Sequence, residues 1–227
     1  MASADLVASA AARTVAAGSA RLFSAWSSSP VPEDADRRCE GVADFAARHA
    51  LVRQVPLGTA GLAAKLLERL EGEGLGEPQE MIYDGANAYL HVGSKWTSFF
   101  IGDRDGPRMV NDPLWPLDAL FGAGDAVELG TDVVRGVPAS HCRVTIDLAR
   151  ADAALQAGVT VPAGPYRALS QMRAEAWLDA AGLARRIAVL TEADADPIWS
   201  VLELWDFGVA ADIVPPAEVV PPREAYS

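Results

Sequence analysis

Residues 138–148 read PASHCRVTIDL, and their pattern decides the fold. Apolar and polar residues alternate, which places Cys142 and Val144 on one face and Arg143 and Thr145 on the other. A period of two residues indicates a β-strand with one buried face. The pattern therefore predicts an antiparallel sheet with other elements packed against its apolar side.

Two later stretches repeat this pattern. AEAWLDAAGLARRIAVL (174–190) contains two alternating segments joined by Ala-Ala-Gly, and IWSVLELWDF (198–207) follows a polar Asp-Ala-Asp-Pro turn. In the first of them Trp177 falls on the polar face of its strand. We therefore expect Trp177 to be a surface aromatic residue or a contact for a partner.

The rest of the chain supplies further strands and several helices. Amphipathic patterns and terminating glycines predict helices over 3–17, 57–71 and 113–122, with a shorter helical segment over 149–158. In the first helix Leu6, Ala10 and either Ala11 or Thr14 share a face. Alternation predicts strands over 19–26, 37–55, 80–101 (three short strands), 126–130 and 132–136, and the long strand 37–55 is expected to bend near 46–47.

These elements predict an α+β fold that is mostly antiparallel β. We expect a curved half-barrel sheet of about ten strands, with two or three helices covering its concave face. Residues 1–213 are predicted to form a single domain, and the proline-rich tail 214–227 is predicted to be extended and loosely attached.

Composition narrows the classes of function. The chain has 227 residues, half of them apolar, and a net charge of −12. This charge disfavours binding to nucleic acid, because phosphates require a basic surface. No segment approaches the ~20 apolar residues of a transmembrane helix.

The sequence shows no catalytic or metal-binding motif. It lacks a Gly-x-Ser-x-Gly elbow, and His49, His91 and His141 do not have the spacing of metal ligands. The carboxylates in TEADADP (191–197) fit a solvated turn better than a calcium loop. We expect a protein that is not an enzyme and has no metal or cofactor. Cys39 and Cys142 fit two buried thiols better than a disulfide, and the disulfide stays an alternative.

Several ordered phrases carry a resemblance to a known family: EMIYDGANAYLHVGSKW (80–96), DPLWPLDAL (112–120), GTDVVRGVPASHCRVTIDL (130–148), AEAWLDAAGLARRI (174–187) and ELWDFG (203–208). In order and spacing, over roughly residues 19–213, they resemble the actinobacterial LppX/LprG-type lipoproteins of the LolA/LolB-like lipid-binding fold. The resemblance implies a half-barrel with helices over its mouth and a hydrophobic cavity that takes acyl chains.

Family members enter the cell envelope through a signal peptide and a lipid-modified cysteine. Neither is visible in the printed sequence, so a cytoplasmic location is expected, with the envelope as the alternative if the chain is a mature fragment.

The expected function is non-catalytic binding of a lipid or another hydrophobic ligand in the half-barrel cavity, as a carrier or chaperone. The alternative is a ligand-sensing or protein-interaction module on the same fold, in which helix 57–71 signals to a protein partner. The oligomeric state is left open. The residues predicted to line the cavity are Leu62, Leu66, Leu70, Trp96, Phe99, Phe100, Trp115, Leu120 and Phe121.

Overall fold

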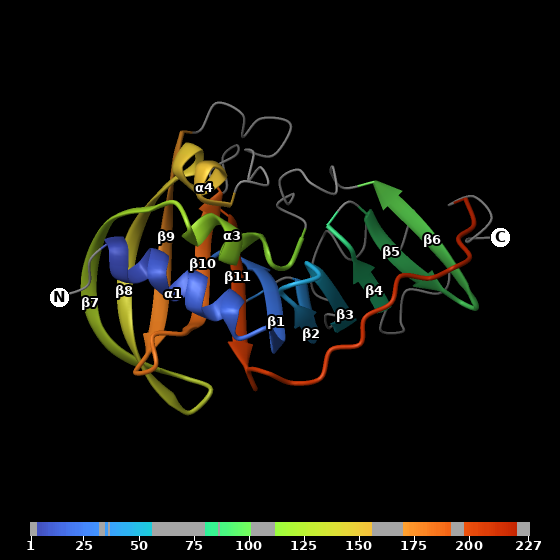
Figure 1. Cartoon of the computed structure of the whole chain (residues 1–227), viewed down its shortest axis with the longest axis horizontal. Coiled ribbons are helices and arrows are strands. Elements are labelled where there is room, and N and C mark those ends of the chain that lie inside the picture. Colours follow the sequence, from blue (N-terminus) through green and yellow to red (C-terminus); the bar gives the residue numbers. More distant parts are fainter. Residues whose placement is uncertain are drawn as a thin grey trace.

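The structure, a computed structural model, describes residues 4–31, 35, 37–55, 80–85, 87–100, 112–155, 170–191 and 198–221. Within these residues, eleven strands form one antiparallel sheet and three helices lie beside it (Figure 1). The strands are β1 (Ser19–Ser27), β2 (Arg37–Asp44), β3 (His49–Val55), β4 (Glu80–Tyr83), β5 (Asn87–Val92), β6 (Lys95–Phe100), β7 (Ala123–Val134), β8 (Val137–Asp147), β9 (Gln171–Asp179), β10 (Ala184–Thr191) and β11 (Ile198–Trp205). The helices are α1 (Ala4–Ala16), α3 (Trp115–Leu120) and α4 (Leu148–Leu155).

The sheet is open. Its strand order is β6-β5-β4-β3-β2-β1-β11-β10-β9-β8-β7, so β6 and β7 form its two edges. Pairing of β1 with β11, with Arg21 opposite Trp205, joins the beginning of the chain to its end. The predicted fold class is confirmed: a curved, mostly antiparallel half-barrel with helices packed on the sheet (Figure 1).

The prediction of one long strand over 37–55 is wrong, because residues 45–48 form the turn of a hairpin between β2 and β3. The carboxylate of Asp44 accepts a hydrogen bond from the backbone N–H of Ala47 at 2.9 Å, a contact typical of aspartate in turns. Arg48 takes the left-handed conformation, with φ of 59°. The irregularity in the alternating pattern near 46–47 therefore marks a turn and not a bend.

The strands predicted over 126–130 and 132–136 are instead parts of the single long strand β7. Its register with β8 shifts between Glu128 and Gly130, and Gly130 has φ of 139°, a value that glycine adopts readily. Arg135 and Gly136 connect β7 to β8, both with positive φ, as in a two-residue hairpin turn.

Helix α1 lies across the end of the sheet formed by β7–β10 (Figure 1). Its buried residues are Val7, Ala10, Ala11 and Thr14, whereas Leu6, expected on the buried face, is 42% exposed. The Thr14 hydroxyl donates to the Ala10 carbonyl at 2.7 Å and accepts the backbone N–H of Ala184, at the start of β10, at 2.9 Å. This hydroxyl anchors the helix to the sheet.

Helix α3 is short and wholly buried, and it packs against α1, α4, β10 and β11. The carboxylate of Asp112 accepts the backbone N–H of Leu114 at 2.8 Å, just before the helix begins.

Helices were predicted over 113–122 and 149–158, and α3 and α4 occupy these places. The predicted helix 57–71 lies outside the described residues. No helix within the described ranges is long and apolar enough to cross a membrane.

Residues 209–221 run as an extended segment along the ends of the strands toward β6 (Figure 1). Ser19 donates a hydrogen bond to the Val209 carbonyl, and a ring nitrogen of His49 lies 3.2 Å from the carbonyl oxygen of Ile213. The Val220 N–H donates to the Trp96 carbonyl at 2.8 Å. The contacts at Val209 and Ile213 precede the predicted tail 214–227, and in the described part of that tail Val220 is attached to β6.

Candidate ligand-binding face

One face of the sheet, which we call the helix-covered face, carries α1 and α3. On strands β8–β11 its side chains are largely bulky and belong to the same buried cluster as residues of both helices. This cluster includes Cys142, Val144, Ile146, Met172, Ala174, Ala176, Leu178, Ile187, Val189, Leu202 and Leu204 on the strands, and Val7, Leu117 and Leu120 on the helices. Here the sheet and helices form a packed core.

On β2–β5 the same face carries several small residues, which lie opposite larger ones such as Val52 and Tyr83. Gly41, Ala43, Ala50 and Ala88, which we call the small-residue wall, lie on the helix-covered face by strand register. At Gly41 the β3 backbone approaches so closely that a Cβ atom would overlap the carbonyl oxygen of Leu51. These four positions add little side-chain volume, and Ala43, Ala50 and Ala88 are buried in the same cluster as the core of β8–β11.

Two polar atoms are buried close to this apolar face without a hydrogen-bond partner among the described residues. They are the hydroxyl of Thr97 on β6 and the indole N–H of Trp115 on α3, and both residues are 0% exposed. Thr97 is opposite Leu90, and Leu90 is opposite Met81, which packs against the core of the helix-covered face. An unsatisfied buried polar group costs about 1–3 kcal/mol, so such groups in native proteins call for an explanation such as a bound molecule.

An ion pair ties the β2–β3 turn to α3. The guanidinium of Arg48 lies 3.2 Å from the carboxylate of Asp118, whose side chain is 9% exposed. The Arg48 Nε atom is also buried without a hydrogen-bond partner within the described residues. The pair holds the helix beside the end of the small-residue wall.

Only some of the residues predicted to line the cavity lie together on the helix-covered face. Trp115 and Leu120 are fully buried in the core of the helix-covered face, and Phe121 packs against it. Trp96 is opposite His91 and stacks on it with ring centroids 4.6 Å apart. Because Trp96 is adjacent to Thr97 in the same strand, its side chain lies on the other face of the sheet. Leu62, Leu66 and Leu70, and the side chains of Phe99 and Phe100, lie outside the described residues.

A second, smaller apolar cluster lies on the opposite face of the sheet and includes Trp177. Trp177 has the predicted face but is 1% exposed, so the expectation of a surface aromatic residue is wrong. The curled β7–β8 hairpin brings Val134 into this cluster, together with Phe23 of β1 and Val201 of β11. The sequence pattern did not predict this contact, because residues 134 and 23 are far apart in the chain.

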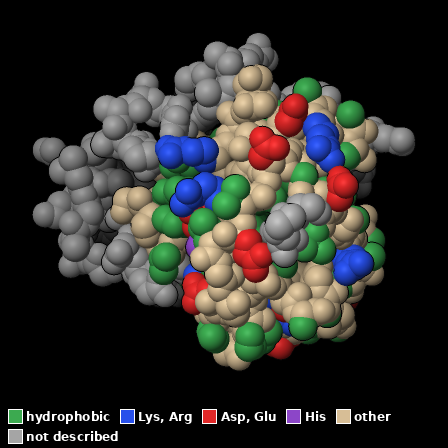
Figure 2. Space-filling view, turned by 90° about the vertical axis from the view of Figure 1, so that its left-hand side faces the viewer, with side chains coloured by type: hydrophobic (Ala, Val, Ile, Leu, Met, Phe, Trp, Pro, Cys, Tyr) green, Lys and Arg blue, Asp and Glu red, His purple; other side chains and the backbone are tan. Residues whose placement is uncertain are grey.

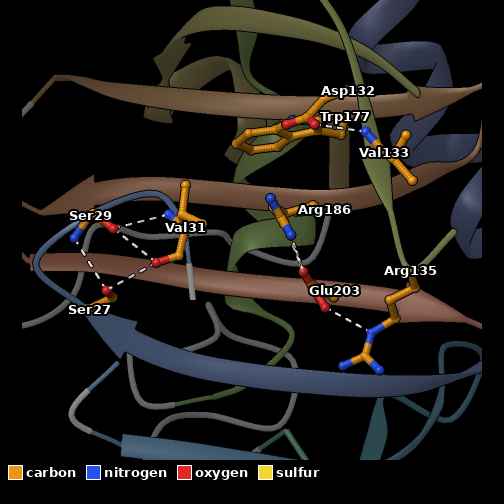
Figure 3. A network of polar contacts seen from close by, with 9 residues as sticks. All are labelled: Ser27, Ser29, Val31, Asp132, Val133, Arg135, Trp177, Arg186 and Glu203. Carbon is orange, nitrogen blue, oxygen red and sulfur yellow. Dashed lines mark hydrogen bonds and ion pairs between the residues drawn. The ribbon is translucent and has the colours of Figure 1, made fainter. Parts of the chain in front are cut away.

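A network of charged side chains lies beside this cluster (Figure 3). The carboxylate of Glu203 on β11 lies 2.6 Å from Arg186 on β10 and accepts a hydrogen bond at 2.8 Å from Arg135 in the β7–β8 turn. The Arg135 guanidinium lies 3.7 Å from the centroid of the Trp205 ring. Glu203 and Arg135 therefore fasten the hairpin to the centre of the sheet.

Two groups in the described part of the chain have perturbed pKa values. A hydrogen bond from the backbone N–H of Val133 lowers the pKa of Asp132, and the Trp177 indole N–H, 3.3 Å away, acts in the same direction. Burial raises the pKa of the Cys142 thiol, and the charge of Glu128 adds to the effect. Cys39 and Cys142 are both free, which contradicts the disulfide alternative.

The histidines make separate contacts. His141 forms a 2.9 Å contact with Glu175 and stacks on Trp177 at 4.2 Å between ring centroids. In the described part of the chain, no group of three or more His, Cys, Asp or Glu residues is placed to hold a metal ion. No arrangement of a nucleophile and a base stands out among these contacts.

No protein-family model and no curated protein matches the sequence. Solved structures do align with nearly the whole chain. LprF from Mycobacterium bovis aligns with a TM-score of 0.56 and 12% identity, over 95% of this chain and 97% of LprF. The chain shares the fold of LprF. The Mycobacterium tuberculosis lipoprotein LppX aligns with a TM-score of 0.54 and 10% identity, over 92% of this chain and 99% of LppX.

These alignments confirm the LppX-like fold that the sequence phrases suggested. A LolA superfamily protein from Nitrosomonas europaea aligns more weakly, with a TM-score of 0.34 and 8% identity over 91% of this chain and 93% of that protein. At these identities the likeness to LprF and LppX concerns the fold.

Proposed function

We propose that the chain binds a lipid or another hydrophobic ligand without chemical change, against the small-residue wall, and acts as a carrier or chaperone. The observation that carries this proposal is the small-residue wall itself, with two buried and unpartnered polar atoms near it. The LppX-like fold supports it, because the resemblance to the LppX/LprG-type lipoproteins implies a hydrophobic cavity that takes acyl chains. The same likeness favours the cell envelope as the place where the chain acts.

Burial of an apolar chain would supply the affinity. Each methylene removed from water contributes about 0.8 kcal/mol, so about ten methylenes contribute roughly 8 kcal/mol before the costs of association. The Trp115 N–H and the Thr97 hydroxyl each offer a hydrogen bond to a polar atom of the ligand. We propose that Leu62, Leu66, Leu70, Phe99 and Phe100 complete the lining.

Filling the small-residue wall should abolish binding while the protein stays folded. In Ala88→Phe, the added ring would occupy the space proposed for the ligand. We expect at least a tenfold loss of affinity for a fluorescent fatty acid, measured by titration of a variant that circular dichroism shows to be folded.

A matched substitution in the packed half of the same face provides the control. Ala174 on β9 is 0% exposed and lies in the core of the helix-covered face. Because added volume strains a packed core by about 1–3 kcal/mol, Ala174→Phe should lower the melting temperature clearly. The proposal fails if the wild type takes up no fatty acid, or if folded Ala88→Phe binds it as the wild type does.

A further inference from the structure

A row of polar residues crosses the helix-covered face beside the small-residue wall. Ser24 on β1 is opposite Cys39 on β2, and Cys39 is opposite Gln54 on β3. Ser24 lies on this face because it is also opposite Leu202, which belongs to the core of the helix-covered face. Gly41 of the small-residue wall is the next residue of β2 on the same face. The row therefore lies directly beside the wall.

Ser200 extends this row onto β11. It is opposite Trp26 of β1 and Val189 of β10, and Val189 belongs to the same core, so Ser200 lies on the helix-covered face as well. Ser200 is 3% exposed, and its hydroxyl is buried without a hydrogen-bond partner among the described residues. A buried hydroxyl of this kind calls for a partner such as a bound molecule. We call four residues the polar band: Ser24, Cys39, Gln54 and Ser200.

Burial of the helix-covered face decreases toward the polar band. Ser24 and Gln54 are half-buried. The preceding residues of β1 and β3 on the same face, Leu22 and Val52, are 0% and 1% exposed. A ligand that lies along these strands would thus have its apolar chain at the buried end and its other end at the polar band.

The side chains of the polar band indicate what kind of ligand end fits. They offer two hydroxyls, a carboxamide and a thiol, which donate and accept hydrogen bonds without carrying a charge. Elsewhere the molecule is different: on the side formed by β7 and α1, hydrophobic, acidic and basic side chains are interspersed (Figure 2). Uncharged hydrogen-bonding groups next to an apolar wall suit an amphiphile with a neutral polar end.

We propose that the polar band binds an uncharged, hydroxyl-bearing head group, while the apolar chain of the same ligand lies on the small-residue wall. This inference rests on the proposed function and adds the class of ligand, a neutral amphiphile. The Ser200 hydroxyl forms a hydrogen bond with the ligand hydroxyl inside the face, and the Gln54 carboxamide forms another at its half-buried end. These two side chains determine the specificity for the head group.

Three fluorescent probes with the same apolar part test the proposal: pyrene-decanol, pyrene-decanoate and decylpyrene. They end in a hydroxyl, a carboxylate and a methyl group, and fluorescence titration with the full chain at neutral pH measures their affinities. The double variant Ser200→Ala with Gln54→Leu removes two hydrogen-bonding groups and should weaken binding of pyrene-decanol roughly tenfold or more. Its affinities for decylpyrene and pyrene-decanoate should change less than threefold. Each single variant should weaken binding of pyrene-decanol roughly threefold.

A matched double variant provides the control. Ser140 on β8 and Gln171 at the start of β9 are both exposed and lie away from β1–β3 and β11. Ser140→Ala with Gln171→Leu makes the same two chemical changes and should alter the affinity for every probe less than twofold. Thermal melting checks that the variants are folded.

Three results would overturn the proposal while the proposed function stands, because decylpyrene still binds in each. They are an unchanged affinity of the folded double variant for pyrene-decanol, equal losses for all three probes, and a loss confined to pyrene-decanoate. The last result would assign the polar band to a charged head group, paired with a cation such as Arg37, which follows Cys39 on this face of β2. If the wild type binds none of the probes, the proposed function fails as well.

Discussion

Glu203→Ala should lower the free energy of unfolding by about 3–5 kcal/mol, the usual cost of removing one partner from a buried ion pair. The side chains of Glu203 and Arg186 are 5% and 9% exposed. Without the carboxylate, the Arg186 guanidinium would stay buried with its charge unpaired. Arg135 would also lose the contact that fastens the β7–β8 hairpin to β11. Urea unfolding followed by circular dichroism measures the change.

Two controls separate the buried charge from the rest of the network. The side chain of Arg135 is 34% exposed, so Arg135→Ala should lower the free energy of unfolding less than Glu203→Ala does. Replacing both buried partners, as in Arg186→Met with Glu203→Leu, should restore most of the lost stability, since an apolar pair of similar volume leaves no charge to desolvate. An unfolding free energy for Glu203→Ala within about 1 kcal/mol of the wild type would contradict the buried network.

Gly122→Ala should also lower the free energy of unfolding strongly. We expect a loss of about 3 kcal/mol or more, which is the upper end of the cost of overpacking a core. Gly122 joins α3 to β7, and its carbonyl accepts the backbone N–H of Asp147 at 2.8 Å. A Cβ atom there would overlap the carbonyl oxygen of Asp147 and lie 2.9 Å from the Cβ of Ala151. Because most of these atoms belong to the backbone, no change of side-chain rotamer relieves the overlap.

Gly124→Ala is the matched control two residues away. There the nearest atom to an added Cβ is the Thr145 carbonyl oxygen at 3.2 Å, so a small adjustment suffices. Thermal or urea unfolding of both variants should show a large loss of unfolding free energy for Gly122→Ala. For Gly124→Ala the loss should be about 1 kcal/mol or less. Equal effects would mean that α3 and β8 are not in close contact at Gly122.

The strands could be predicted because their signal is local. Alternation in 138–148 and 174–190 identified β8, β9 and β10, and for β8 it also identified the buried face. The hairpin between β2 and β3 was missed because its turn, residues 45–48, contains neither the Asn-Gly nor the Asp-Gly pair that marks many hairpins. Arg48 takes the left-handed conformation there in place of a glycine.

The burial of the face opposite the helix-covered face could not be predicted from the sequence, for a different reason. Alternation predicts that Arg186 and Glu203 point away from the main core, and a polar outward face usually meets solvent. Here the β7–β8 hairpin curls over that face and buries both residues. Only the register across five strands brings Arg135 to Glu203, and no local pattern encodes it.

The candidate ligand-binding face was partly predictable. The aromatic residues of 112–121 correctly indicated a helix buried against the sheet, with Trp115 at its start. The assignment of Trp96 to the same face failed because it rested on the residue type, whereas the strand register decides the face. The small-residue wall was not foreseen, because alanine and glycine in a strand give only a weak signal of what covers them.

Native mass spectrometry of the chain, purified without detergent, tests the central claim most directly. The account predicts a folded protein that carries a lipid-sized mass, released when the collision energy is raised. If the mass is that of the polypeptide alone, and added fatty acid leaves it unchanged, the small-residue wall holds no apolar ligand and the proposed function is contradicted.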